Sequence, residues 1–228
     1  MKELYTTYED NYKTLCELEQ DDIERSLRLF NIRIRLAIDI EISFKGNVSL
    51  TKTPAVKETY VLIIQLMELW NAYEALSHYV SEVSDHIAKK AGKSKIFTQT
   101  FLKIIGSLSI LEQAINEIKT NYQVDKFKKD FNTYIDKVKD DARLSKTLKE
   151  DAESIRMYAK NEKDISGIEI LSLIYAERNM YYHNGETAKM GMSYSNRKKL
   201  ISIYKKALLQ HTLTVANAII TEQTEASI

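Results

Sequence analysis

Cysteine, proline and glycine are scarce in this sequence, and their scarcity limits the folds that it can adopt. Of the 228 residues, one is cysteine, one is proline and six are glycine. The single cysteine, Cys16, cannot form a disulfide within the chain, and a cysteine-based metal site within one chain is excluded. Glycine and proline, which commonly form the turns between strands, are rare, whereas apolar residues recur at helical spacing along nearly the whole chain. We therefore expect an all-α protein.

A strong net charge and a long apolar run are also missing. The formal net charge of +1 argues against a broad basic surface that coats nucleic acid non-specifically, although a small basic site remains open. No segment reaches about 18 uninterrupted apolar residues, so no membrane span is expected. Residues 1–10 lack the basic start and the apolar run of a secretory signal. These features predict a cytoplasmic protein.

Apolar residues, which with tyrosine make up 44% of the chain, are numerous enough to close a sizeable core. They recur at helical spacing in stretches that we expect to be helices: residues 21–44, 56–90, 97–122, 119–164 (one or two peripheral helices), 168–182 and 195–221. Ser195 is a candidate cap for the last of these helices. The apolar face of residues 21–44 is wide enough to need covering on two sides.

The segment 46–54 is the best break in the sequence, because it begins with Gly-Asn and ends with Pro54. It predicts an N-terminal helical extension, residues 1–54, and a helical bundle domain, residues 55–228. The extension is expected either to enlarge an interface between two copies of the chain or to bind a regulator.

Residues 178–183 read R-N-M-Y-Y-H and end an apolar predicted helix. Chance supplies about 0.14 R-x-x-x-x-H pairs in this composition, and about 0.01 when asparagine must follow the arginine. Cleavage of RNA by its own 2′-hydroxyl needs a group that exchanges protons near neutral pH and a fixed positive charge on the phosphate. His183 and Arg178 suit these tasks. No acidic cluster with histidine has metal-ligand spacing, so a metal-independent mechanism without a cofactor is expected.

This motif resembles that of the HEPN superfamily, in which arginine, a small polar residue and then histidine lie in a bundle of four or five helices. Residues 69–76, L-W-N-A-Y-E-A-L, are similar to the first long helix of such domains, and the resemblance covers about residues 56–221. It implies an HEPN-like bundle of four to five core helices and an endoribonuclease that leaves a 2′,3′-cyclic phosphate. It also implies a role in a bacterial toxin or antiviral defence system, with an antitoxin or regulatory protein as partner.

The resemblance also implies how the motif works. Five residues along an ideal helix correspond to about 140° of rotation and about 7.5 Å of rise, so the two side chains do not share one face. In catalytic members of the family, two motifs meet across a dimer interface, and we therefore expect a homodimer with a composite site. Asn179 would orient the phosphate or the histidine by hydrogen bonds. Toxin members often carry a tyrosine two residues after the histidine, where this chain has Gly185, which argues against nucleotide attachment there.

Further residues are candidates for binding. Lys198 and Lys199 follow the motif and could hold the RNA backbone, although solvated lysines are a common alternative. Glu74 is a weaker candidate, which would hold a site residue from a facing helix. Two other functions stay open, namely a non-catalytic HEPN-like module that binds RNA, nucleotide or protein, and a plain helical scaffold.

Overall fold

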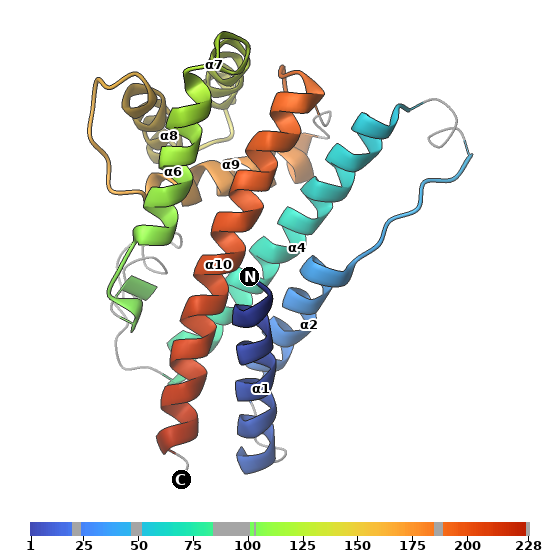
Figure 1. The fold of residues 1–228 in the computed structure, drawn as a ribbon, viewed down its shortest axis with the longest axis vertical. Coiled ribbons are helices and arrows are strands. Elements are labelled where there is room, and N and C mark those ends of the chain that lie inside the picture. The colour runs from blue at the N-terminus through green and yellow to red at the C-terminus, as the bar shows by residue number, and fades with distance from the viewer. Residues whose placement is uncertain (20–23, 47–51, 84–100, 103, 185–188, 227–228) are drawn as a thin grey trace.

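The computed structural model describes residues 1–19, 24–46, 52–83, 101–102, 104–184 and 189–226, and its regular structure there is entirely helical (Figure 1). The all-α class is therefore confirmed. No helix of the described ranges is long and apolar enough to cross a membrane. The helices are α1 Lys2–Glu19, α2 Arg25–Asp39, α4 Pro54–Val83, α6 Ser109–Tyr122, α7 Asp125–Asp140, α8 Lys146–Ala159, α9 Glu169–Asn184 and α10 Tyr194–Ala226.

Two long helices, α4 and α10, lie side by side at the centre of the molecule (Figure 1). Both bury residues around much of their circumference, as a helix packed on several sides must. They run parallel, since Lys198 pairs with Glu58, and the ammonium of Lys205 donates to Gln65 Oε1 at 2.7 Å. α2 packs on α4 and α1 on α10, whereas α6 covers α10 from the other side. α9 crosses behind α10 and contacts both central helices (Figure 1).

Several helix ends differ from those predicted. The helix expected over 97–122 is interrupted at Gly106, whose φ of +66° and N–H bond to the Leu102 carbonyl (2.7 Å) form a left-handed helix end. The helix expected over 21–44 ends at Asp39, because Ile40 is extended. Ser195 is not the cap, since α10 begins at Tyr194. The parts of the predicted helices in 20–23 and 84–100 lie outside the described residues.

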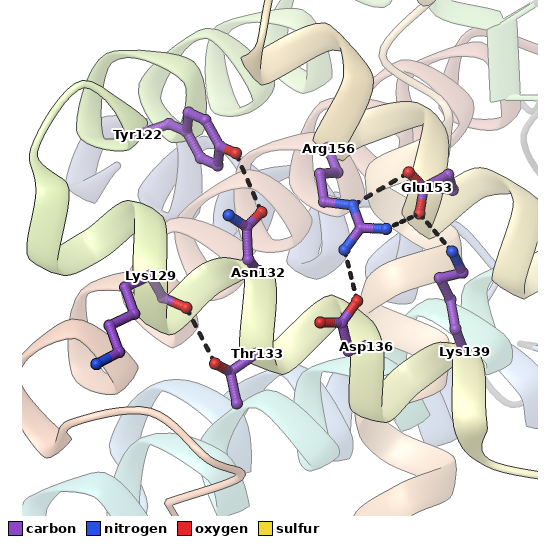
Figure 2. Close-up of polar contacts among 8 residues, drawn as sticks. All are labelled: Tyr122, Lys129, Asn132, Thr133, Asp136, Lys139, Glu153 and Arg156. Carbon is purple, nitrogen blue, oxygen red and sulfur yellow. Dashed lines mark hydrogen bonds and ion pairs between the residues drawn. The ribbon is translucent and has the colours of Figure 1, made fainter.

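The charged stretch 119–164 forms two helices, α7 and α8, which are joined by polar side chains (Figure 2). Arg156 of α8 donates to Asp136 of α7 at 2.5 Å and also binds Glu153 on its own helix. The Lys139 ammonium of α7 donates to the same Glu153 carboxylate at 2.8 Å. Much of the charge in this stretch therefore joins the two helices.

The two N-terminal helices share the main hydrophobic core. Leu15 of α1 and Phe30 of α2 are fully buried in the same cluster as the apolar residues of α4 and α10. Arg33 of α2 donates to Glu68 of α4 at 2.8 Å. One apolar stripe of α2 is buried in this core, whereas the other stripe is exposed within the described ranges. The exposed stripe consists of Leu29, Ile32 and Leu36.

The core also contains an ionisable residue, His211 of α10, which is fully buried. Its ring lies 5.9 Å from that of Phe101 and 6.3 Å from that of Tyr73, measured between centroids. Neither ring nitrogen has a hydrogen-bond partner among the residues that the structure describes. Burial lowers the pKa of His211 from 6.5 to about 4, so the folded chain favours the neutral ring.

Replacing Phe30 by alanine tests whether α2 is part of the core. We expect Phe30→Ala to lower the free energy of unfolding by about 3–5 kcal/mol, because a fully buried ring is lost and a cavity is left. Ile32→Ala is the matched control on the same helix, since that side chain is 55% exposed, and it should change stability by about 0.5 kcal/mol or less. Urea unfolding measures both. Equal effects of the two variants would contradict the packing of α2.

Stability should also depend on the protonation of His211. Its pKa is lower in the folded chain than the 6.5 of an unfolded chain, so its contribution is complete above pH 6.5 and is lost as pH falls toward 4. Between pH 7.5 and pH 5, this group alone should lower the free energy of unfolding by about 2 kcal/mol. His211→Leu should reduce the measured pH dependence by that amount, whereas His78→Leu at an exposed position should not. An unchanged pH dependence in His211→Leu would refute this assignment.

Candidate active site at the end of α9

The start of α9 is fixed by a glycine and a carboxylate. Gly167 has a φ of +97°, and a Cβ there would lie 3.0 Å from the backbone nitrogen of Glu112 on α6, so the close approach favours glycine. The Glu169 carboxylate accepts hydrogen bonds from the Gly167 N–H at 3.0 Å and from the Ser166 hydroxyl at 3.2 Å. These contacts set where the helix starts, and hence which residues of the motif face inward.

A buried ion pair then sets the rotation of α9. Glu177, the residue before the motif, pairs with Arg197 of α10, and the two residues are 1% and 0% exposed. Tyr134 of α7 donates its hydroxyl to the Glu177 carboxylate at 3.2 Å. The guanidinium carbon of Arg197 lies 5.3 Å from the centroid of the Tyr134 ring. Three helices therefore meet at one carboxylate, which holds α9 in a single orientation.

The charges in this cluster stabilise each other against the cost of burial. Burial, the largest single influence, disfavours the charged form of Arg197. The Glu177 carboxylate, together with Tyr134 and Tyr204, more than offsets it, so the pKa of Arg197 is raised. Burial raises the pKa of Tyr134 well above its ordinary value, so this hydroxyl stays protonated and donates. Removing one member of such a pair leaves a buried charge without its counter-ion, which costs about 3–5 kcal/mol.

Arg178 and Asn179 are half-buried and follow the ion pair directly. The Nη1 of Arg178 donates to the Asn179 side-chain oxygen at 3.1 Å. The Arg178 guanidinium carbon also lies 5.3 Å from the centroid of the Tyr182 ring, one turn further along the helix. The buried Nε of Arg178 has no hydrogen-bond partner among the described residues. An unsatisfied buried donor costs about 1–3 kcal/mol, which a nearby acceptor would relieve.

His183 lies in the last turn of α9, whose helical backbone continues to Asn184. The spacing between Arg178 and His183 therefore corresponds to about 140° of rotation, as the sequence predicts for an ideal helix. The side chains of His183 and Asn184, together with residues 185–188, lie outside the described part of the chain. The turn predicted at Gly185 stays a prediction.

The structure places the candidate lysines on the first turns of α10, next to Arg197. Lys199 is exposed, whereas Lys198 is half-exposed and paired with Glu58 of α4. Lys198 is therefore partly neutralised by the protein itself, and of the two lysines Lys199 is the more accessible to a bound anion.

Glu74 lies far along α4 from the end of the motif. Burial and the neighbouring Tyr60 of α4 raise the pKa of Tyr181, which places the end of α9 beside the start of α4. The Trp70 ring contacts that of Tyr175, which lies six residues before Tyr181 on α9, with centroids 5.3 Å apart and planes tilted by 34°. From Tyr60 to Glu74 the rise along α4 is about 21 Å. The described contacts thus bring Arg178 and Asn179 together without Glu74.

A pocket of about 390 Å³ lies near the motif on another side of α9. Met180 contributes to its wall and is two residues from Arg178, which corresponds to about 200° of rotation, so the pocket does not belong to the guanidinium. Its wall consists of Lys137, Asp140, Asp141, Ala142, Arg143, Met180 and Met190. No group of three or more histidine, cysteine or acidic residues in the described ranges could hold a metal ion.

The ion pair beneath the motif was missed in the sequence, although a signal for it exists. Arg197 precedes Ile201 and Tyr204 at the same spacing of four and three that marks the apolar face of α10. A charged residue on such a face indicates a buried counter-ion elsewhere. Asp130 was missed as well: it accepts bonds from the Ser193 backbone and hydroxyl (2.9 and 2.6 Å) at the start of α10.

Single and double substitutions test the ion pair. Glu177→Leu should destabilise the chain by about 3–5 kcal/mol, because Arg197 remains charged and buried. The double variant Glu177→Leu with Arg197→Met should recover most of that loss, since two apolar side chains can replace a buried pair. Lys146→Met with Glu150→Leu is a control at an exposed pair on α8, and its single and double variants should each change stability by less than about 1 kcal/mol. Equal destabilisation by the single and the double variant, measured by urea unfolding, would contradict the pairing.

No protein-family model, curated protein or solved structure matches this chain.

Proposed function

We propose that this chain is a metal-independent endoribonuclease of the HEPN type. The observation that carries the proposal is the arrangement of Arg178: its guanidinium is held by Asn179 and Tyr182 at the end of a helix anchored by a buried ion pair. An arginine in this setting suits binding of a phosphate, because its planar N–H groups match phosphate oxygens. His183, five residues further along the chain, has an imidazole, which can exchange protons near neutral pH.

The reaction proposed is attack of an RNA 2′-hydroxyl on the adjacent phosphorus. A histidine takes the proton of the 2′-hydroxyl as the new O–P bond forms. The bond to the 5′-oxygen breaks, and that oxygen receives a proton from an acid, so the products are a 2′,3′-cyclic phosphate and a 5′-hydroxyl. Arg178 would stabilise the negative charge that develops on the phosphate oxygens, and Asn179 would hold the guanidinium in place.

One chain supplies one histidine from the motif, whereas this reaction uses both a base and an acid. A two-fold axis that brings two α9 ends together would supply two copies of Arg178, Asn179 and His183. The composite site of a homodimer is therefore part of the proposal. The ring of Tyr182 is exposed at the same end of α9. The proposed dimer interface must leave part of this end uncovered, because RNA has to enter the site.

The cellular role proposed is that of a toxin or antiviral defence nuclease, which an antitoxin or another regulatory protein would restrain. Lys199 is the exposed lysine nearest the ion pair in sequence, and it is proposed to contact the RNA backbone together with Lys198. Breaking the Lys198–Glu58 pair would be needed for Lys198 to contribute fully.

Incubation of the purified chain with total RNA in EDTA tests the proposal. We expect cleavage products that end in a cyclic phosphate, because the 2′-hydroxyl is the nucleophile. Arg178→Ala and His183→Ala should each lower the rate by about 10²–10⁴-fold, through loss of charge stabilisation and of proton transfer respectively. Arg143→Ala and His78→Ala are controls at exposed positions outside the motif, and they should leave the rate unchanged.

A concentration series in the same assay tests the composite site. Activity per chain should rise with protein concentration through the range in which sedimentation shows dimers forming. Full activity per chain at concentrations where only monomers exist would refute the shared site. Cleavage that survives Arg178→Ala and His183→Ala would refute the catalytic assignment, and RNA binding without cleavage would indicate a non-catalytic module.

A further inference from the structure

Tyr182 stands out because of its exposure. All fourteen tyrosines of the chain lie in the described ranges, and the other thirteen are buried or half-buried. Tyr182 exposes 50% of its surface, and it is the one aromatic residue among the exposed large hydrophobic side chains of the described ranges. An exposed ring forfeits the free energy of burial that aromatic side chains ordinarily contribute. Tyr182 lies near the end of α9 and within the motif, so its exposed ring is available to a ligand that binds there.

The Tyr182 ring has neighbours that restrict its orientation. The Tyr181 ring meets it edge to face, with centroids 5.9 Å apart and planes at 72°. The guanidinium of Arg178 lies 5.3 Å from its centroid. Tyr181 itself is half-buried and packs against the hydrophobic core, so it supports the Tyr182 ring from the protein side. An exposed ring that is held in place loses little conformational freedom when a flat ligand stacks on it.

We infer that Tyr182 is a stacking platform for a base of single-stranded RNA, at the same site at which Arg178 binds a phosphate. The inference rests on the proposed function and specifies its substrate class. Proteins that bind single strands combine a positive charge for the backbone with aromatic rings for the bases, and Arg178 and Tyr182 place both groups within one helical turn. The guanidinium lies over one face of the ring, so the base would stack on the opposite face while the positive charge binds a phosphate.

The geometry favours a single strand over a duplex. In an RNA duplex, the bases are stacked on one another and paired, so their faces are not available to a protein ring. A single-stranded loop or end can turn a base outward onto Tyr182. Stacking does not read hydrogen-bonding edges, so this contact would contribute affinity with little base preference.

The test measures binding apart from cleavage. The probe is a fluorescent single-stranded oligoribonucleotide of about twelve nucleotides with 2′-O-methyl groups, which cannot be cut by attack of its own 2′-hydroxyl. Fluorescence anisotropy gives its affinity for the full-length chain. Tyr182→Ala should weaken binding about 5- to 150-fold, the range for loss of one stacked base. Tyr182→Phe and Tyr182→Trp keep a ring and should bind within about twofold of the original chain.

Tyr158→Ala is the matched control, because Tyr158 is a half-buried tyrosine on α8 with the Lys119 ammonium 4.2 Å from its ring centroid. It should leave the affinity unchanged. A 2′-O-methyl duplex of the same sequence should bind more weakly, and Tyr182→Ala should not alter its affinity. Circular dichroism confirms that each variant is folded, which the exposure of Tyr182 leads us to expect.

Several outcomes would overturn the inference: no binding of the single strand, unchanged affinity in Tyr182→Ala, or an equal loss in Tyr158→Ala. Loss of dimers in Tyr182→Ala, seen by sedimentation, would instead make this ring a protein contact and would also overturn it. The two proposals fail separately. A chain that binds the probe through Tyr182 but cuts no RNA refutes the nuclease, and a chain that cuts RNA with unchanged probe affinity in Tyr182→Ala refutes the platform.

Discussion

The buried ion pair between Glu177 and Arg197 is the interaction on which the arrangement of the motif depends. Both charges are removed from water, so each needs the other and α9 cannot rotate without separating them. Tyr134 adds a hydrogen bond from a third helix. Since Arg178 and Asn179 follow Glu177 directly, their position at the surface is a consequence of a carboxylate that faces inward.

We expect this pair to contribute more to a defined geometry than to stability. Apolar side chains of similar volume can be equally stable in a core, but here they would lack the directional contacts that Glu177 makes with Arg197 and Tyr134. In a site formed by two copies of one helix end, any shift of that end moves both motifs, so the distance between their catalytic groups changes by up to twice the shift. Catalytic groups must lie within about 0.5 Å of their productive positions, so a rigid anchor next to the motif suits the composite site proposed here.

The sequence predicts the helical class and the general course of most helices, because apolar periodicity is a local signal. It does not predict the break at Gly106, since a glycine inside an apolar helical pattern is also tolerated there. Arg178 and Asn179 could be identified as a pair from their motif. The spacing of Arg197 on the apolar face of α10 indicates that this residue is buried, but its partnership with Glu177 depends on how α9 and α10 pack, which no local pattern specifies.

The end of a helix at which the motif lies has its own electrostatic effect. Exposed carbonyl groups give a helix C-terminus a partial negative charge, which repels a phosphate and attracts a cation. A phosphate at the end of α9 therefore needs more positive charge than a site at a helix start would. Arg178 is one such charge, and it leaves a net charge of about +0.5 after the helix end is counted. A second copy of the chain would add another arginine together with its own helix end, so the net charge that faces the phosphate would rise to about +1. Two motifs would therefore attract a phosphate more strongly than one.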